Sequence, residues 1–424
     1  VGILIATNII HCEDFANITF LGELSLDGKL NKIEGALPMV ISLRELGIKK
    51  VVLPYENRNE CGVIDDVCII PVKSLNEVVD YLNGEINIEF HNNYNLLNNS
   101  EEQLYDEDFS DIKGQDGLKR ALEVAAAGLH NILIIGPPGS GKTMAARRLP
   151  TILPDLTFEE SVEITKIYSV AGLLKNDYLV SNRPFRAPHH TASASSLIGG
   201  GRVPKPGEVS LAHHGVLFLD ELPEFQRKVL EVLRQPLEDG FVTISRVMAT
   251  LTYPSDFMLV ASMNPCPCGY YGDPYHECTC SQANIDNYLS KISNPLLDRI
   301  DIHTEVLPVN YVDLNSDIKS ESSKDIKMRV NNAREMQIDR FKGEEILYNS
   351  QLSSQKVKKY CKLNGNAEKI MKSAFNKFKF SARSYNKILK VARTIADLDG
   401  EDIIGERHIL EAIQYRSLDK KYWG

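Results

Sequence analysis

The chain has 424 residues, and at an average of about 150 residues per domain this length predicts two or three domains. Hydrophobic residues make up 43% of the sequence and charged residues 25%, a balance that excludes a wholly disordered chain. No run of about 18 or more uncharged apolar residues occurs, so we expect no membrane span. The formal net charge of −9 argues, as an average over the chain, against a nucleic-acid partner.

Residues 1–84 alternate short apolar runs with turns, which predicts a small α/β domain. Val1–Ala6 is typical of the end of a buried helix, so we expect the chain to begin inside a domain. Strands are predicted at Ile18–Leu21 and Val51–Pro54, and a helix over residues 35–47.

Residues 85–112 have the composition of a linker. They carry eight acidic residues and no Lys or Arg, and their apolar periodicity fades. A solvated, self-repelling segment of this kind is typical of a connection between domains. We therefore expect a domain boundary here.

Residues 113–310 predict a parallel sheet flanked by helices, and so an α/β fold. The strand-like runs Ile132–Ile135, Val216–Leu219 and Met258–Ala261 alternate with helical stretches. Residues 318–417 differ, because long, charged stretches there have a helical period. We expect this last part to be a helical lid domain.

One segment fits the phosphate-loop pattern G-x-x-x-x-G-K-[ST] at every required position. It follows a predicted strand and precedes a predicted helix, so its backbone N–H groups are expected to surround phosphate oxygens. The lysine would bridge the β- and γ-phosphates of ATP, and the threonine would bind Mg²⁺. The residues expected to bind nucleotide here are Gly136, Pro137, Pro138, Gly139, Ser140, Gly141, Lys142 and Thr143.

Polar side chains follow two further predicted strands. Asp220 and Glu221 come directly after Val216–Leu219, at the strand end where open α/β sheets bind ligands. We expect Asp220 to hold Mg²⁺ and Glu221 to act as the general base on the attacking water. Asn264 follows the third strand and either orients that water or ends the strand as a capping residue.

Beyond the phosphate loop, the chain resembles AAA+ ATPases related to the magnesium-chelatase I subunit, and among them the ComM/YifB-type competence proteins. The resemblance covers nearly the whole chain. It rests on the segments Gly136–Thr143, Phe185–Thr191, Ala212–Phe225, Met263–Gly269 and Pro295–Asp301.

This resemblance implies further site residues. Arg299 matches the arginine finger that acts on ATP bound by a neighbouring subunit, and a homo-hexameric ring is therefore implied. Arg383 matches the sensor-2 arginine of the lid, and Gly114 and Gln115 match a segment that packs near the adenine. From the residues alone, Arg299 could equally pair with Asp298 or Asp301, and Arg383 could be one more cation on a basic helix.

The N-terminal block resembles the C-terminal part of a Lon-protease-like domain. Gly22–Gly28 and Leu46–Pro54 carry this resemblance. The lysine of the Lon Ser–Lys dyad would fall at Leu37, and the serine would precede Val1. Because a Ser nucleophile without its base is weak, we expect no protease activity and a structural or DNA-contacting role.

Positive charge is concentrated in Lys356–Arg393, which contains twelve Lys or Arg and one acid. Such a segment can bind phosphates, or it can be a solvated helical face. The resemblance also implies that two inserted hairpins, Gly199–Gly207 and Phe241–Arg246, line a channel and grip DNA. The candidate DNA-binding residues there are Arg202, Lys205 and Arg246.

The chain has eight cysteines, too few for a disulfide scaffold and in keeping with a reducing cytoplasm. Four of them form two C-x-C pairs, Cys266 with Cys268 and Cys278 with Cys280. Four thiolates can hold a tetrahedral structural Zn²⁺. The other interpretation is a group of reduced thiols beside the nucleotide site.

Together these features predict a ring-forming, ATP- and Mg²⁺-dependent DNA motor, a helicase or branch-migration enzyme of natural transformation or recombination. The alternative is a chelatase-like ATPase that drives metal insertion with a partner subunit. The Lon-like block favours the motor, since magnesium-chelatase I subunits are not built with it. An ATP-dependent protease is disfavoured by the missing lysine.

Overall fold

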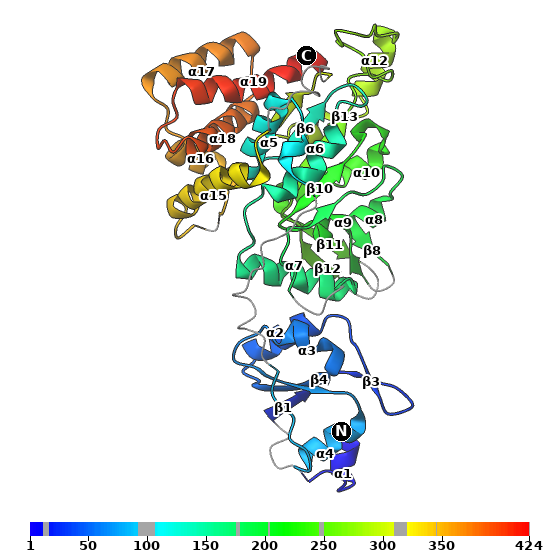
Figure 1. Ribbon diagram of the computed structural model, residues 1–424. Helices are drawn as coiled ribbons and strands as arrows, with labels where there is room; N and C mark the ends of the chain where they lie inside the picture. The colour runs from blue at the N-terminus through cyan, green and yellow to red at the C-terminus, as the bar shows by residue number, and fades with distance from the viewer. Residues whose placement is uncertain are drawn as a thin grey trace. The chain divides into compact units, whose positions relative to one another are not determined.

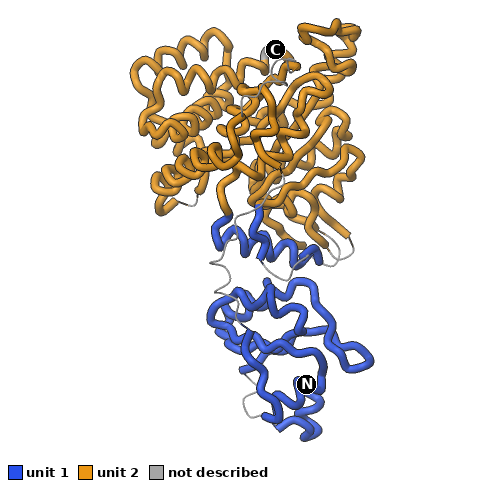
Figure 2. The backbone as a smooth tube through the Cα atoms, viewed as in Figure 1, with its two compact units in different colours: residues 1–104, 156–182 blue, residues 105–155, 183–424 orange. Residues whose placement is uncertain are grey.

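The computed structural model describes residues 1–11, 17–91, 107–174, 179–201, 204–245, 250–308, 320–344 and 346–423. They form two compact units, Val1–Leu104 with Leu156–Asn182, and Tyr105–Asp155 with Arg183–Gly424 (Figure 2). Residues 156–182 group with the first unit, although they lie inside the range 113–310 predicted as the ATPase core. Among the described residues, none of the helices combines the length and apolar character needed to cross a bilayer.

The first unit is built on a parallel sheet of three strands, in the order β1 (Ile18–Phe20), β4 (Lys50–Pro54) and β5 (Cys68–Val72) (Figure 1). The predicted strands and the helix over 35–47 are confirmed by β1, β4 and α2. The other elements are a short antiparallel pair, β2 (Glu23–Leu24) and β3 (Leu30–Asn31), a 3-10 turn, η2 (Tyr55–Asn57), and the helices α1 (Gly2–Ala6), α2 (Ala36–Glu45), α3 (Arg58–Cys61), α4 (Leu75–Leu82) and α7 (Phe158–Ala171).

Two details of the first unit bear on the sequence predictions. The helix at the N-terminus forms, but the expectation that it is buried is wrong, because α1 has no buried residue and Ile3 is 80% exposed. Leu37, at the position of the Lon dyad lysine, is fully buried in the apolar core between α2 and the sheet.

The second unit contains a five-stranded sheet in which every neighbouring pair of strands is parallel. This sheet, with helices around it, confirms the predicted α/β fold (Figure 1). The phosphate-loop strand is the second strand from one edge of the sheet, and all four of its residues are buried. The strand order is β14 (Ile302–Glu305), β6 (Ile132–Ile135), β13 (Met258–Met263), β10 (Val216–Leu219) and β7 (Phe185–Arg186).

Short helices and two antiparallel hairpins complete the sheet domain. The hairpins are β8 (Gly199–Gly200) with β9 (Lys205–Pro206), and β11 (Phe241–Ser245) with β12 (Thr250–Pro254). The helical elements are η4 (Phe109–Asp111), α5 (Asp116–Gly128), α6 (Lys142–Arg148), η5 (Leu149–Thr151), α8 (Ala194–Ile198), α9 (Glu208–Leu211), η6 (Leu222–Glu224), α10 (Arg227–Glu231), α11 (Arg234–Asp239), α12 (Gln282–Leu289) and α13 (Asn294–Leu297).

The C-terminal part is helical, as predicted, and shares one apolar core with the sheet. Helix α5 contacts α15 and α18, while α19 contacts β14. In Figure 1 these helices, yellow to red, lie together beside the sheet. They are α15 (Ser323–Arg340), η7 (Asn349–Gln351), α16 (Ser354–Tyr360), α17 (Gly365–Phe378), α18 (Ala382–Leu398) and α19 (Glu406–Trp423).

The described ends of the acidic segment belong to the two folded units. In the first unit, His91 donates its backbone N–H to Ile69 O at 3.0 Å. In the second, Phe109 and Ile112 are buried in the main core, and Asp108 accepts a hydrogen bond from Ser323 N at 3.1 Å. The middle of the predicted linker, residues 92–106, lies outside the described residues.

Candidate nucleotide site

The phosphate loop connects β6 to α6 and lies at the carboxyl end of the sheet. Gly139 and Gly141 have φ angles of 75° and 86°, a left-handed region that suits glycine and that turns the backbone into the loop. Helix α6 begins at Lys142. The local geometry is therefore that of a loop able to enclose phosphate oxygens.

Lys142 is held inward by acceptors of the same site. Its Nζ donates to Gly136 O and Pro137 O, each at 2.7 Å, and to Asn264 Oδ1 at 3.1 Å. Burial lowers the pKa of Lys142 to about 8, although the negative charges of Asp220 and Glu221 oppose this shift. The structure thus brings Asn264, from the end of β13, to the lysine of the phosphate loop.

Thr143 and Asp220 lie together as a pair of oxygen donors. Thr143 Oγ1 donates to Asp220 Oδ2 at 2.7 Å, and Ser262 Oγ donates to Asp220 Oδ1. A hydroxyl beside a carboxylate is the oxygen-donor chemistry that Mg²⁺ prefers, so these residues fit that ion. Ser262 was not among the predicted site residues, because nothing in its local sequence marks it.

Glu221 follows Asp220 in a left-handed conformation with φ 53°, uncommon for a residue with a side chain. Its N–H donates to Asp220 Oδ1 at 3.1 Å. The exposed carboxylate lies 3.7 Å from His190 Nδ1. His190 belongs to the segment Phe185–Thr191 used for the resemblance, but sequence reasoning gave it no role beside Glu221.

Gly114 and Gln115 lie near the same edge of the sheet. Both have left-handed φ angles, 61° and 58°, just before α5. Gln115 Nε2 donates to Leu307 O at 2.6 Å, and Leu307 lies two residues beyond the end of β14, the neighbour of the phosphate-loop strand. This placement of Gly114 and Gln115 is compatible with a position near a nucleotide bound at the phosphate loop.

Arg299 and Arg383 make their described contacts with residues outside the phosphate loop. The Arg299 guanidinium pairs with Glu238 and donates to Pro295 O at 2.6 Å and Arg234 O at 3.2 Å. It therefore pairs with neither Asp298 nor Asp301. Arg383 NH1 lies 3.8 Å from Asp298 Oδ2, which brings the two arginines to the same part of the subunit.

The basic segment Lys356–Arg393 is not one solvated face. Arg393 is fully buried and hydrogen-bonds to Asp397, while Lys390 donates to Ser350 O at 2.8 Å. Lys387 donates to Ile300 O at 2.9 Å. These cations stabilise the helical part from within. Exposed Lys remain on and around α17, namely Lys358, Lys359, Lys362, Lys369, Lys372, Lys377 and Lys379.

Both predicted hairpins form, and they contact each other. Tyr253 of β12 donates its hydroxyl to Pro204 O at 2.9 Å. Lys205 is exposed on β9. Arg202 and Arg246, the other two candidate DNA-binding residues, lie outside the described residues.

The four clustered cysteines converge. Sγ of Cys266 lies 3.3 Å from that of Cys268 and 3.7 Å from that of Cys278, and the Cys268–Cys278 distance is 3.6 Å. All four sulfurs, that of Cys280 included, lie within 4.8 Å of one another. The short C-x-C spacing does not prevent the thiols from facing a common point.

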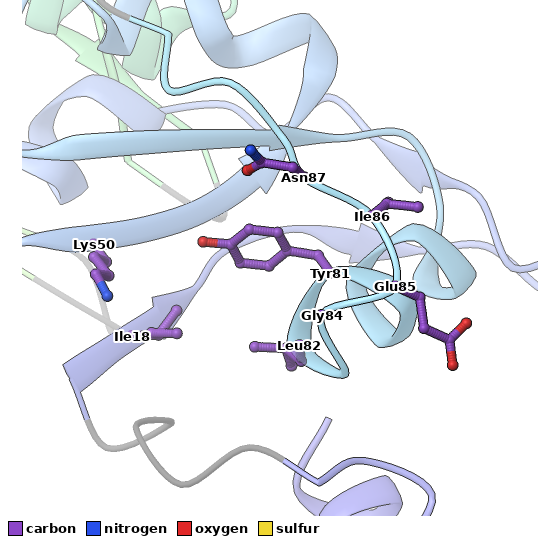
Figure 3. A pocket seen from close by; sticks show the side chains of 8 residues that line it. All are labelled: Ile18, Lys50, Tyr81, Leu82, Gly84, Glu85, Ile86 and Asn87. Atoms are coloured by element: carbon purple, nitrogen blue, oxygen red, sulfur yellow. The ribbon is translucent and has the colours of Figure 1, made fainter.

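The first unit has a pocket of about 530 Å³, which is unrelated to the phosphate loop (Figure 3). Its walls come from β1, β4 and the end of α4. The lining residues are Ile18, Lys50, Tyr81, Leu82, Gly84, Glu85, Ile86 and Asn87.

Three family models match the chain. Residues 108–314 match the model described as magnesium chelatase, subunit ChlI, and residues 320–416 match its C-terminal model. Residues 1–57 match a model described as subunit ChlI of Mg-chelatase. The matches over residues 108–416 cover the phosphate loop, Asp220, Glu221 and the helices after them.

Individual relatives extend this likeness over the full chain. The chain is 40% identical to competence protein ComM of Haemophilus influenzae, covering 99% of this chain and 81% of that protein. It is 39% identical to the uncharacterized protein YifB of Escherichia coli over the same shares. The magnesium-chelatase 38 kDa subunit of Rhodobacter capsulatus is 26% identical over 37% of this chain and 50% of its own length. The chain therefore belongs to the ComM/YifB family of magnesium-chelatase-like AAA+ proteins, and this membership indicates an ATPase.

Proposed function

We propose that this protein is a ring-forming ATPase that moves along DNA, as a helicase or branch-migration enzyme of natural transformation or recombination in the cytoplasm. The observation that carries the proposal is the coverage of the relatives. A relative named competence protein matches 99% of the chain, whereas a magnesium-chelatase subunit matches 37% of it.

In this proposal the phosphate loop and two strand ends act on ATP. Lys142 exchanges its carbonyl partners for phosphate oxygens, and Thr143 and Asp220 hold Mg²⁺, which neutralises charge developing on the phosphates. Glu221 accepts a proton from the attacking water, and Asn264 holds that water or the γ-phosphate in place. Gly114 and Gln115 pack near the adenine.

Arg299 acts as an arginine finger on ATP bound by a neighbouring subunit, and Arg383 acts as the sensor-2 arginine of the lid. The placement of Arg299 supports its role, because its contacts with Pro295 and Glu238 lie outside the phosphate loop. A hexameric ring completes each site with Arg299 of the neighbouring subunit. Glu238 must release Arg299 when the neighbouring nucleotide is present.

DNA contacts in this proposal are electrostatic and independent of sequence. The hairpin residues Arg202, Lys205 and Arg246 grip the backbone in the ring's channel, and the exposed Lys on α17 provide a second basic surface. Contacts of Arg and Lys to phosphates tolerate any base sequence, which suits a translocating motor.

The test is ATP hydrolysis with and without DNA. We expect single-stranded or branched DNA to stimulate the wild-type rate, and ATP to drive strand displacement or branch migration. Glu221→Gln should lower the hydrolysis rate by about 10²-fold or more while ATP still binds, since a general base contributes about that much. If no form of DNA stimulated ATP hydrolysis, the proposal of a DNA motor would be contradicted and only the ATPase would remain.

A second candidate is a chelatase-like ATPase that drives metal insertion together with a partner subunit. The family descriptions favour it, including the match over residues 1–57. Because residues 1–57 match a model described as a magnesium-chelatase subunit, the N-terminal block no longer favours the DNA motor over the chelatase. The same hydrolysis assay distinguishes them, because a chelatase-like ATPase would respond to its partner and not to DNA.

A further inference from the structure

We propose that Cys266, Cys268, Cys278 and Cys280 bind one structural Zn²⁺, and that residues 265–281, here called the cysteine turn, fasten the phosphate loop to helix α19. The turn lies between β13, which ends at Met263, and α12, which begins at Gln282. It therefore follows Asn264 directly. This inference concerns the architecture of the nucleotide site and holds for either proposed function.

The sulfur positions fit a tetrahedral zinc site. A Zn–S distance of about 2.3 Å places tetrahedral sulfur atoms about 3.8 Å apart. The observed Sγ–Sγ distances of 3.3, 3.6 and 3.7 Å are close to that value, and the fourth sulfur lies within 4.8 Å of the others. All four cysteines are free thiols, so none is committed to a disulfide.

The cysteine turn also needs a cross-link. No helix or strand forms between Asn264 and Ser281, and segments longer than about 12–15 residues without such structure are uncommon in compact domains. Residues 270–280 are mostly exposed and contribute little to the core. Local polar contacts hold the tip, where Asp273 accepts hydrogen bonds from Tyr275 N at 2.7 Å and His276 N at 2.8 Å.

One side of the turn contacts the phosphate loop. Gly269 has a φ of 87°, and a Cβ added there would lie 2.6 Å from Pro138 Cδ, so the Gly269 backbone packs closely against the Pro138 ring. Asn264, two residues before Cys266, accepts the hydrogen bond from Lys142 Nζ. A displaced turn would therefore move both Pro138 and the partner of the phosphate-loop lysine.

The other side contacts α19. The rings of Tyr271 and Tyr422 meet edge to face with centroids 6.4 Å apart, and a Cβ at Gly272 would lie 3.7 Å from Lys421 Nζ. Both α19 residues bind Glu305, the last residue of β14, at 2.6 to 2.8 Å. The turn thus joins the nucleotide loop to the last helix of the chain through a metal that a chelator or a cysteine variant can remove.

The experiment measures zinc and nucleotide binding in the full chain, purified under reducing conditions. We expect about one zinc per chain by elemental analysis. The double variant Cys278→Ser, Cys280→Ser should lose more than nine-tenths of the zinc. Its affinity for a fluorescent ATP analogue should weaken about tenfold, because the displaced turn moves Pro138 and Asn264; this is the lower end of the loss of activity that follows disruption of the surroundings of a metal site. Cys68→Ser, in the first unit, is the matched control and should keep both properties.

A second variant distinguishes zinc binding from the effect of the cysteine turn on ATP binding. Gly269→Ala should retain the zinc, because its backbone lies outside the ligand set, but should weaken ATP binding severalfold through the contact with Pro138. It also keeps the inference testable if the double cysteine variant does not fold.

Two outcomes would overturn the inference. Wild-type protein with less than about a tenth of a zinc per chain, or with iron instead, would exclude the proposed site. Zinc-bearing Gly269→Ala and zinc-free cysteine variants that bind ATP as the wild type does would exclude the link to the phosphate loop. Neither readout requires DNA, so failure here is distinguishable from failure of the DNA motor.

Discussion

The Lys142 ammonium group is surrounded by two carbonyl oxygens and the Asn264 amide oxygen. These neutral acceptors satisfy the ammonium group without supplying a full negative charge. The lysine therefore stays partly desolvated, and its pKa is lowered to about 8. Phosphate oxygens would replace these acceptors and favour the charged form.

ATP affinity should for this reason depend on pH. Bound phosphates keep Lys142 protonated, whereas the free protein loses this proton above its pKa of about 8. Binding at higher pH must then include proton uptake, so affinity should fall by up to about tenfold per pH unit. Titrations of the Glu221→Gln variant between about pH 7 and pH 9.5 measure this without hydrolysis.

Lys142→Arg is the control, because a guanidinium stays charged across this range. Its affinity, weaker or not, should be independent of pH. Equal affinity of the Lys142 protein at both ends of the range would show that the lysine is already charged in the free protein.

At this scale the sequence predicted the parts of the site that have a local pattern. The phosphate loop has fixed spacing, and Asp220 and Glu221 end a strand, so each could be identified from its neighbours. Ser262 and His190 could not, because their contacts with Asp220 and Glu221 arise only when separate strands meet in the sheet. Arg299 pairing with Glu238 was missed for the same reason.

At the scale of elements, the connection before β14 is joined to α18 by a buried polar network. Asp301 Oδ2 lies 3.1 Å from His130 Nδ1, and its Oδ1 lies 3.2 Å from Lys387 Nζ. His130 Nε2 also bonds to Thr394 Oγ1 of α18 at 2.8 Å. Burial alone would raise the pKa of Asp301, but Lys387 and His130 outweigh it and hold the pKa below its usual value.

Asp301→Asn should therefore destabilise the second unit by about 3 to 5 kcal/mol, since it leaves Lys387 buried without its charge partner. The depressed pKa makes this stabilisation complete above the usual carboxyl value of 3.8 and lost as the pH falls below it. Urea unfolding should show a constant difference between wild type and variant at neutral pH and a shrinking one in acid. Asp298→Asn removes the 3.8 Å pair with exposed Arg383 and a weaker charge interaction with Lys387, so it should change stability much less than Asp301→Asn does.

The same helices show where charge counting fails. The twelve cations of Lys356–Arg393 look alike in the sequence, but the fold buries Arg393 and uses Lys387 and Lys390 to bind carbonyl oxygens. Helical periodicity predicted the helices themselves. It could not predict that α18 packs against both α5 and α19, so that a basic face becomes an internal one.

At the scale of the whole molecule, the proposed ring can be tested by mixing inactive subunits. Arg299→Ala lacks the finger but keeps Glu221, and Glu221→Gln lacks the base but keeps Arg299. In a random mixed ring about a quarter of the interfaces would contain both intact residues, so ATPase activity should partly return. Steady-state hydrolysis across mixing ratios measures this.

Mixing Glu221→Gln with Lys142→Ala is the matched control. Both residues act in the same half of a site, so no interface becomes whole and no activity should return. Recovery in this pair, or none with Arg299→Ala, would contradict sites shared between neighbouring subunits.

The common core of sheet and helices limits how the second unit of this ATPase can change its shape. Ile134 of β6 and Ile388 of α18 belong to one continuous apolar core, and opening a gap inside it would cost about 25 cal/mol for every Å² exposed. The sheet and the C-terminal helices should consequently move together as one rigid body. In the proposed ring, the motion driven by ATP hydrolysis would then occur at the interfaces between neighbouring subunits.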